Sequence, residues 1–165
     1  MVKHDPLAAK FKSDAYLGFD FGNKKIGVAV GYADTGIASP LQTIRSLNQV
    51  PDWDVIGKLI TEWRPIGLVV GISRQQDGTD NVITPRMQKF CRQLNGRYNL
   101  PVHQIDETLT TFAAKQLLYD DLKVSAGKLW AVQDQLAAQL ILQSWFDGEA
   151  QAARSKGQAS KPPPP

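Results

Sequence analysis

The stretch Leu17–Gly31, LGFDFGNKKIGVAVG, constrains the fold more than any other part of the sequence. It predicts an apolar strand, a tight turn made by Gly-Asn-Lys-Lys and a second apolar strand, which together form a β-hairpin. A single acid, Asp20, stands near the end of the first strand. An ionised carboxylate is rarely buried unless it is hydrogen-bonded, ion-paired or bound to a metal. Asp20 therefore predicts that another part of the chain supplies its partner.

The remainder of the sequence predicts one further strand in the meander and then helices alternating with strands. The predicted elements are a strand at 36–44, a helix at 52–63, a buried strand at 66–72, a helix from 84, a strand at 100–105, a helix from 110 and a helix at 130–146. An antiparallel meander followed by crossover units gives a mixed five-stranded sheet flanked by helices. This order points toward an α/β, ribonuclease-H-like architecture.

The chain of 165 residues predicts one folded domain at 15–147. Residues 1–14 lack periodicity, so we expect a flexible lead-in. Residues 148–165 are rich in Gln, Ala and Lys and end in four prolines, a composition that predicts a disordered tail. The single cysteine, Cys91, excludes an internal disulfide and fits a reducing compartment. No apolar run approaches the roughly 20 residues of a membrane helix, and no secretory signal is evident, so we expect a soluble, cytoplasmic protein.

Asp134 lies on the side of the last helix that we expect to face the sheet. The apolar residues that share this stripe, three, four, seven and eleven positions further on, are Ala137, Ala138, Ile141 and Trp145. The same spacing predicts that the opposite, solvent-facing side carries Gln135, Gln139 and Gln143. Asp20 and Asp134 are therefore both expected to point inward.

A further acidic pair, Asp106-Glu107, stands where the strand at 100–105 ends, and Glu107 can join the other two acids if this strand neighbours the first. Clustered carboxylates repel one another unless a cation neutralises them, and Mg²⁺ prefers oxygen ligands. Two such ions about 4 Å apart would activate a water and stabilise the leaving oxygen of a phosphodiester. The alternative is that Asp134 stabilises the helix dipole and that Asp106-Glu107 caps the next helix.

Four segments occur in an order that resembles a known family: DFGNKKIGVAVG, VVGIS…DGT…TPR…F, IDETLTT and QDQLAAQLIL. From Tyr16 to Phe146 the chain is similar to the YqgF/RuvX family. Its members are regarded as Holliday-junction-resolvase-like nucleases and as nucleases that mature the 5′ end of the 16S ribosomal RNA precursor. The resemblance implies a ribonuclease-H-like fold and hydrolysis of phosphodiester bonds with Mg²⁺ or Mn²⁺, as two ions.

Matched position by position, the resemblance implies that the catalytic metal ligands are Asp20, Glu107 and Asp134, with Asp106 as a further metal ligand beside Glu107. It implies that Lys24 and Arg86 bind the substrate. Two positions depart from the family's usual pattern. Ser73 stands where the family often has Pro, and Thr108 stands where it often has Arg, which weakens the expectation of a phosphate contact there.

The basic residues near Asp20 have two interpretations. Lys24 and Lys25 lie in the predicted turn, where they could meet a phosphate or serve only to solvate the hairpin. The second predicted helix carries a basic flank formed by Arg86, Lys89, Arg92 and Arg97. A solvated helix face explains such a flank about as well as contact with nucleic acid does, and the net charge of +3 permits either.

The clustered acids favour a metal-dependent nuclease. The family resemblance implies that it is an endonuclease acting on the precursor of 16S ribosomal RNA, with a Holliday junction or other branched DNA as the alternative substrate. Two other hypotheses remain open at this point: a single-domain nucleotide binder related to actin-like ATPases and sugar kinases, and a non-catalytic assembly factor on ribosomal precursor particles. Both a monomer and a homodimer are compatible with the sequence.

Overall fold

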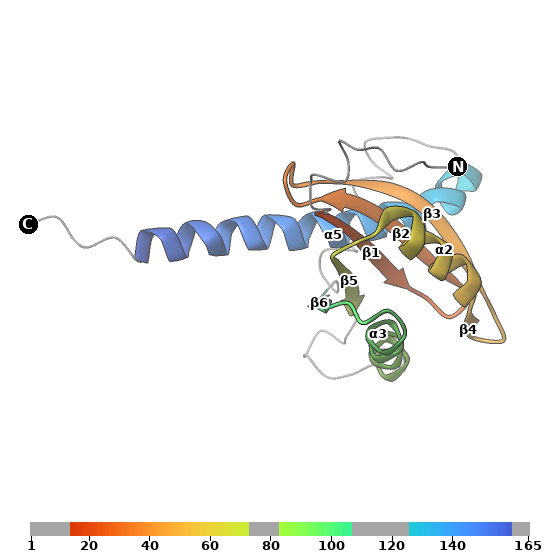
Figure 1. The fold of residues 1–165 in the computed structure, drawn as a ribbon. Helices are drawn as coiled ribbons and strands as arrows, with labels where there is room; N and C mark the ends of the chain where they lie inside the picture. Colours follow the sequence, from red (N-terminus) through yellow and green to blue (C-terminus); the bar gives the residue numbers. More distant parts are fainter. Residues whose placement is uncertain (1–13, 73–82, 107–125, 160–165) are drawn as a thin grey trace, which may run out of the picture.

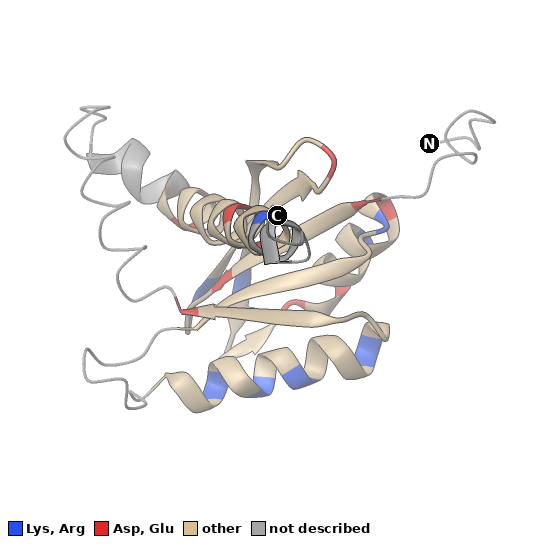
Figure 2. Cartoon of the chain, turned by 90° about the vertical axis from the view of Figure 1, so that its left-hand side faces the viewer, with Lys and Arg blue, Asp and Glu red and all other residues tan. Residues whose placement is uncertain are grey.

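A computed structural model describes residues 14–72, 83–106 and 126–159 of the chain (Figure 1). A six-stranded sheet in the order β4-β3-β2-β1-β5-β6 lies between α5 on one face and α2 and α3 on the other (Figure 2). The expected mixed sheet flanked by helices is thus confirmed. The helix expected from 110, the loop at 73–82 and the positions Ser73, Glu107 and Thr108 lie outside the described residues.

The sheet combines an antiparallel meander with two parallel strands, as the order of elements predicted. The meander consists of β1 (Ala15–Phe21), β2 (Lys25–Tyr32) and β3 (Ile37–Leu47). On the other side of β1, β5 (Gly67–Ile72) runs parallel to it, and β6 (Val102–Asp106) runs parallel to β5.

A sixth strand, β4 (Val50–Pro51), corrects the expectation of five. It pairs with the end of β3 through a two-residue turn in which Asn48 and Gln49 have φ values of 51° and 66°. Positive φ at both central residues matches the twist of a tight hairpin, but the usual sequence signal is a glycine at the second position. The sequence lacks that glycine, and two residues are too few to show a period.

The helices α2 (Trp53–Trp63) and α3 (Thr84–Tyr98) cover one face of the sheet. Asp52 caps α2 by accepting a hydrogen bond from the Val55 N–H at 3.3 Å. Phe90 of α3 packs edge-on against Phe19 of β1, with ring centroids 5.6 Å apart. These contacts form the larger apolar core.

The other face of the sheet is lined by small residues, which let α5 (Ala126–Ala159) approach closely. The positions that β1 and β2 turn toward this helix are Gly18, Gly27, Ala29 and Gly31. A methyl group at Gly18 would lie 2.8 Å from the Leu142 Cβ, so a larger residue there would push the helix away. The buried side chains of α5 pack directly against this channel of small residues, formed by Gly18, Gly27, Ala29 and Gly31.

Three glutamines of α5 are half-buried against the sheet, which corrects the expectation that they face solvent. Gln143 donates to the Gly36 carbonyl at 2.7 Å and accepts from the Ala38 N–H at 3.0 Å, while Gln139 donates to the Ala38 carbonyl at 3.0 Å. Gln135 donates to the Thr43 hydroxyl at 3.3 Å. The sheet curls around α5, so the helix contacts β3 as well as β1 and β2, and its amides satisfy backbone groups of β3.

The helix α5 also continues well past the sheet (Figure 1). We expected a disordered tail from residue 148, but residues 148–159 extend α5, and only 160–165 lie outside the described part of this end. Gln, Ala, Lys and Arg are good helix formers, so this polar stretch can prolong a helix without burying a core. None of the described helices is long and apolar enough to span a membrane.

Cys91 should resist alkylation in the folded protein. Burial raises the pKa of its thiol from 9.0 to about 11. Since the thiolate is the reactive form, iodoacetamide at pH 9 should modify the native protein roughly fiftyfold more slowly than the urea-unfolded chain, as followed by mass spectrometry. Equal rates in the two states would show that this core opens readily.

Candidate functional site

Asp20 and Asp134 come together where α5 crosses the hairpin. Asp20 of β1 is paired with Gly27 of β2, and residues directly opposite in an antiparallel pair present their side chains on the same face. A side chain at Gly27 would overlap the backbone carbonyl of Asp134. The carboxylate of Asp20 is therefore on the face that α5 covers, next to the turn of the helix that carries Asp134.

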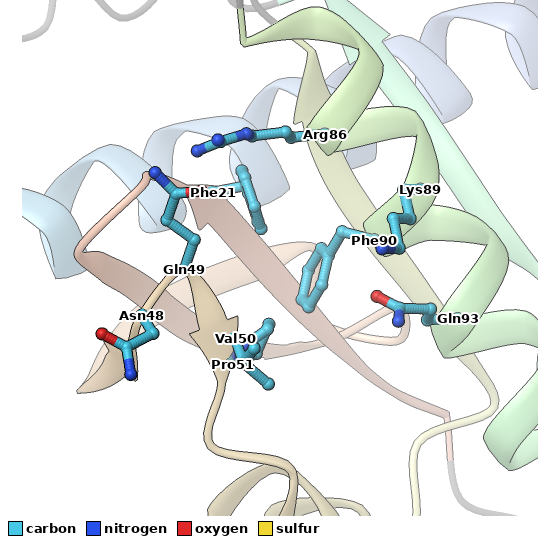
Figure 3. Close-up of a pocket in the computed structure, with 9 residues that line it drawn as sticks. All are labelled: Phe21, Asn48, Gln49, Val50, Pro51, Arg86, Lys89, Phe90 and Gln93. Atoms are coloured by element: carbon cyan, nitrogen blue, oxygen red, sulfur yellow. The ribbon is translucent and has the colours of Figure 1, made fainter.

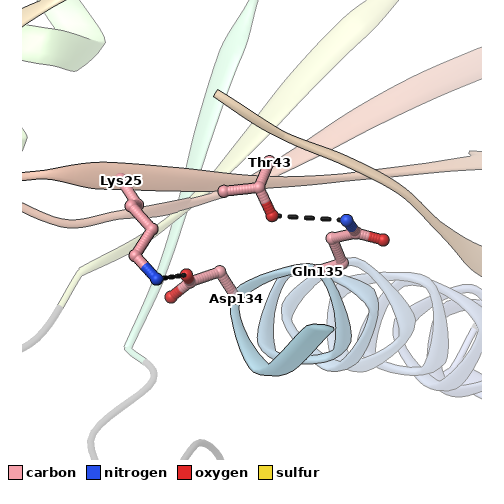
Figure 4. A network of polar contacts seen from close by, with 4 residues as sticks. All are labelled: Lys25, Thr43, Asp134 and Gln135. Atoms are coloured by element: carbon pink, nitrogen blue, oxygen red, sulfur yellow. Dashed lines mark hydrogen bonds and ion pairs between the residues drawn. The ribbon is translucent and has the colours of Figure 1, made fainter. Parts of the chain in front are cut away.

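Lys25, at the start of β2, reaches toward the same turn of α5 (Figure 4). Its Nζ lies 3.8 Å from Oδ2 of Asp134, and the side chains retain 30% and 21% exposure, respectively. The neighbouring hydrogen bond from Gln135 to Thr43 holds this end of the helix against β3. One carboxylate oxygen of Asp134 thus faces a positive charge at the start of β2.

The sheet places Asp106 on the opposite face from Asp20. Ile105 packs into the apolar cluster under α5. Gln104 points to the other face, where its side chain donates a 2.8 Å hydrogen bond to Gln88 of α3. Side chains alternate along a strand, so Asp106 projects to the α3 side with Gln104. The structure therefore does not bring Asp106 together with Asp20 and Asp134.

The strand that leads to Glu107 is not adjacent to β1, because β5 lies between them. Asp20 is paired with Gly71, and Gly71 with Ile105, so these three residues form a row across the sheet. With about 4.8 Å between strands, the end of β6 is roughly 10 Å from Asp20. Gly71, in the middle of the row, has no side chain to fill the space between them.

Two of the predicted substrate-binding residues lie around the turn that follows Asp20. Lys24 is exposed, and its carbonyl accepts a hydrogen bond from the Ser46 N–H at 2.9 Å. Arg86, at the start of α3, donates to the Asn23 side-chain oxygen at 2.7 Å. Sequence reasoning did not single out Asn23, although an amide in a turn before two lysines is a suitable partner for an arginine.

Within residues 14–72, 83–106 and 126–159, no three His, Cys, Asp or Glu side chains are grouped as a metal site. The site as described therefore consists of two carboxylates, Asp20 and Asp134, with Lys25 beside them and Lys24 and Arg86 at the turn. Glu107 belongs to the part of the chain that is not described.

This fold is that of ribonuclease-H-like resolvases. The yeast mitochondrial Holliday junction resolvase aligns with a TM-score of 0.52 at 12% identity, covering 87% of this chain and 82% of that chain. The fowlpox virus resolvase, solved with Holliday junction DNA, aligns with a TM-score of 0.50 at 14% identity, covering 82% of this chain and 98% of that chain.

The sequence comparisons identify the family. A family model described as RuvX, Holliday junction resolvase, matches residues 14–148. A protein of Methylococcus capsulatus is 49% identical over 140 residues, which cover 85% of this chain and 93% of that protein. One of Pseudomonas putida is 47% identical over 135 residues, covering 79% and 93%, and both are named "Putative pre-16S rRNA nuclease". The chain belongs to the RuvX family, as its four segments indicated.

Replacing Gly27 by alanine should displace α5 at Asp134. Overpacking of this kind typically costs about 1–3 kcal/mol, and urea unfolding would measure the loss in the free energy of unfolding. Gly96→Ala is the matched control, because a methyl group at that helical position would meet no atom within 4 Å other than its chain neighbours and the backbone of its own helix. The control should gain about 0.5–1 kcal/mol. A Gly27→Ala protein as stable as wild type would contradict the close packing of α5.

Proposed function

We propose that this protein is a metal-dependent endonuclease that hydrolyses phosphodiester bonds during maturation of the 5′ end of 16S ribosomal RNA. The observation that carries the proposal is the position of α5, which holds Asp134 against the sheet residue paired with Asp20. The names of the two bacterial relatives support the ribosomal substrate. Ribosomal precursor particles in the cytoplasm are the proposed partners.

The described carboxylates fit Mg²⁺ or Mn²⁺, because both ions prefer oxygen ligands. We propose that Asp20, Glu107 and Asp134 hold two ions. When bound, such ions supply an activated water and stabilise the charge on the leaving oxygen.

Glu107 is preferred to Asp106 as the third ligand. The direction of Asp106, toward α3 and away from Asp20, supports this choice. Thr108 and Ser73 carry no role in the proposal.

The basic residues have separate tasks in this proposal. Lys25 balances the charge of Asp134, while Lys24 and Arg86 hold the phosphates that flank the scissile bond. The hydrogen bond between Arg86 and Asn23 supports this role, because it fixes the guanidinium beside the turn. An arginine positioned in advance loses less side-chain freedom when it binds a phosphate.

Branched DNA is the second candidate substrate. The description of the matching family model and the fowlpox virus resolvase with its junction DNA favour it. Cutting a two-fold junction symmetrically requires two copies of the site, so this candidate also requires a homodimer, whereas processing of an RNA end does not.

The Asp20→Asn variant should lose Mg²⁺-dependent cleavage of a labelled 16S precursor while still binding it. Removing a proposed ligand should reduce the rate by more than the roughly 10–100-fold typical of changes around a metal site. Asp52→Asn is the matched control, because asparagine caps a helix as well as aspartate does, and it should cleave normally.

Cleavage by Asp20→Asn at the wild-type rate would refute the proposed mechanism. Preference of the wild-type protein for a four-way DNA junction over the precursor would select the second substrate. Binding of the precursor without cleavage, even by the wild-type protein with Mg²⁺ or Mn²⁺, would instead identify an assembly factor.

A further inference from the structure

A groove of about 310 Å³ lies between α3 and the turn that joins β3 to β4 (Figure 3). Its apolar floor includes Phe21 and Phe90, and its rim carries Arg86 and Lys89. The left-handed turn at 48–49 brings Asn48 and Gln49 to the wall opposite α3, which contributes Gln93. Of the residues that line the groove, only Arg86 has a role in the proposed cleavage.

The groove begins one residue beyond the candidate active site. Phe21 follows Asp20 directly in β1, so their Cα atoms are about 3.8 Å apart. Their side chains lie on opposite faces of the sheet, Asp20 toward α5 and Phe21 in the core under α2 and α3. Arg86 lines the groove and also binds Asn23 of the β1–β2 turn, so it links the two places.

The chemistry of the lining fits one nucleotide. Two cations stand on the rim, and no carboxylate occurs among the described residues that line the groove. The side-chain amides on both walls can donate to and accept from the edge of a base, and the exposed Val50 offers an apolar contact. Ligand pockets begin at about 300 Å³, so the volume suits a single nucleotide and not a duplex.

Positively charged residues continue from the rim of the groove along α3 (Figure 2). The sequence of α3 contains four Lys and Arg residues and no Asp or Glu. One of the four, Arg97, lies with its guanidinium 4.1 Å above the Trp53 ring and so helps to join α3 to α2. Lys89 and Arg92 are exposed and continue the positive surface that starts at Arg86.

We propose that this groove binds an unpaired nucleotide of the substrate strand, next to the phosphate that is cut. The inference rests on the proposed nuclease function and narrows its substrate to nucleic acid with a single-stranded segment at the cleavage point. A strand that crosses the end of β1 passes from the acids on one face to the groove on the other. The phosphate pairs with Arg86 and Lys89, and the base lies against Phe21 and the amides.

Binding can be measured apart from cleavage in the full-length Asp20→Asn protein without divalent metal. The probes are a fluorescein-labelled blunt hairpin and the same hairpin with a five-nucleotide single-stranded extension, each as RNA and as DNA. Fluorescence anisotropy should show roughly tenfold tighter binding of the extended probe.

Two further changes in this background test the groove itself. Lys89→Ala should remove most of the preference and reduce the salt dependence of binding by about 0.7 in log K against log salt, as expected for one lost phosphate contact on a single strand. Gln93→Trp fills the groove without changing charge and should also remove the preference. Lys58→Ala, an exposed lysine on α2, is the matched control and should change neither quantity. Thermal unfolding verifies that each variant is folded.

Equal affinity for blunt and extended probes in both polymers, or a full preference retained by the folded Gln93→Trp variant, would overturn the inference. A preference in either polymer supports it and shows which one the groove accepts. Cleavage by the wild-type protein without any binding preference would refute nucleotide binding in the groove but not the proposed nuclease activity. A binding preference without cleavage would refute the nuclease activity but not nucleotide binding in the groove.

Discussion

The close packing of α5 on a channel of small residues is the constraint on which the rest of the structure depends. Gly18, Gly27 and Gly31 leave no side chain between the helix and the hairpin. The approach brings Asp134 to the residue paired with Asp20, and Lys25 into contact with Asp134. It also lets two glutamines of α5 donate hydrogen bonds to backbone carbonyls at the start of β3. The same helix packing therefore positions the two acids and satisfies backbone groups of the neighbouring strand.

The two faces of the sheet carry different groups at the end of β1: the acids lie on the α5 face and the groove lies on the α3 face. Alternation along β1 sends Asp20 toward α5 and Phe21 toward α3, although the two residues are neighbours in the chain. The acids and the groove therefore share the end of one strand while remaining separate in environment, one acidic and metal-binding in our proposal, the other cationic and partly apolar. The Arg86–Asn23 hydrogen bond lies at the boundary between them.

Much of this arrangement could be predicted because its signals are local. An acid in an apolar strand and an acid on an apolar helix stripe each identify a residue that must turn inward, and the helical spacing placed Asp134 correctly relative to Ala138. The glutamines of α5 gave the wrong expectation, because a periodicity argument assumes that only one side of a helix is covered. The curl of the sheet covers a second side, and curl depends on contacts between strands far apart in the sequence.

The sequence by itself determined every described strand except β4, the inward-pointing acids and the family. These features depend on patterns among residues that are close together in the chain. Only the tertiary structure decided that Asp106 faces away from Asp20, that β5 separates β6 from β1, and that Arg86 meets Asn23. The same holds for the groove, whose walls come from segments more than thirty residues apart. The face and neighbour of a residue are settled by strand order and register, which arise from packing of the whole sheet and have no local signature.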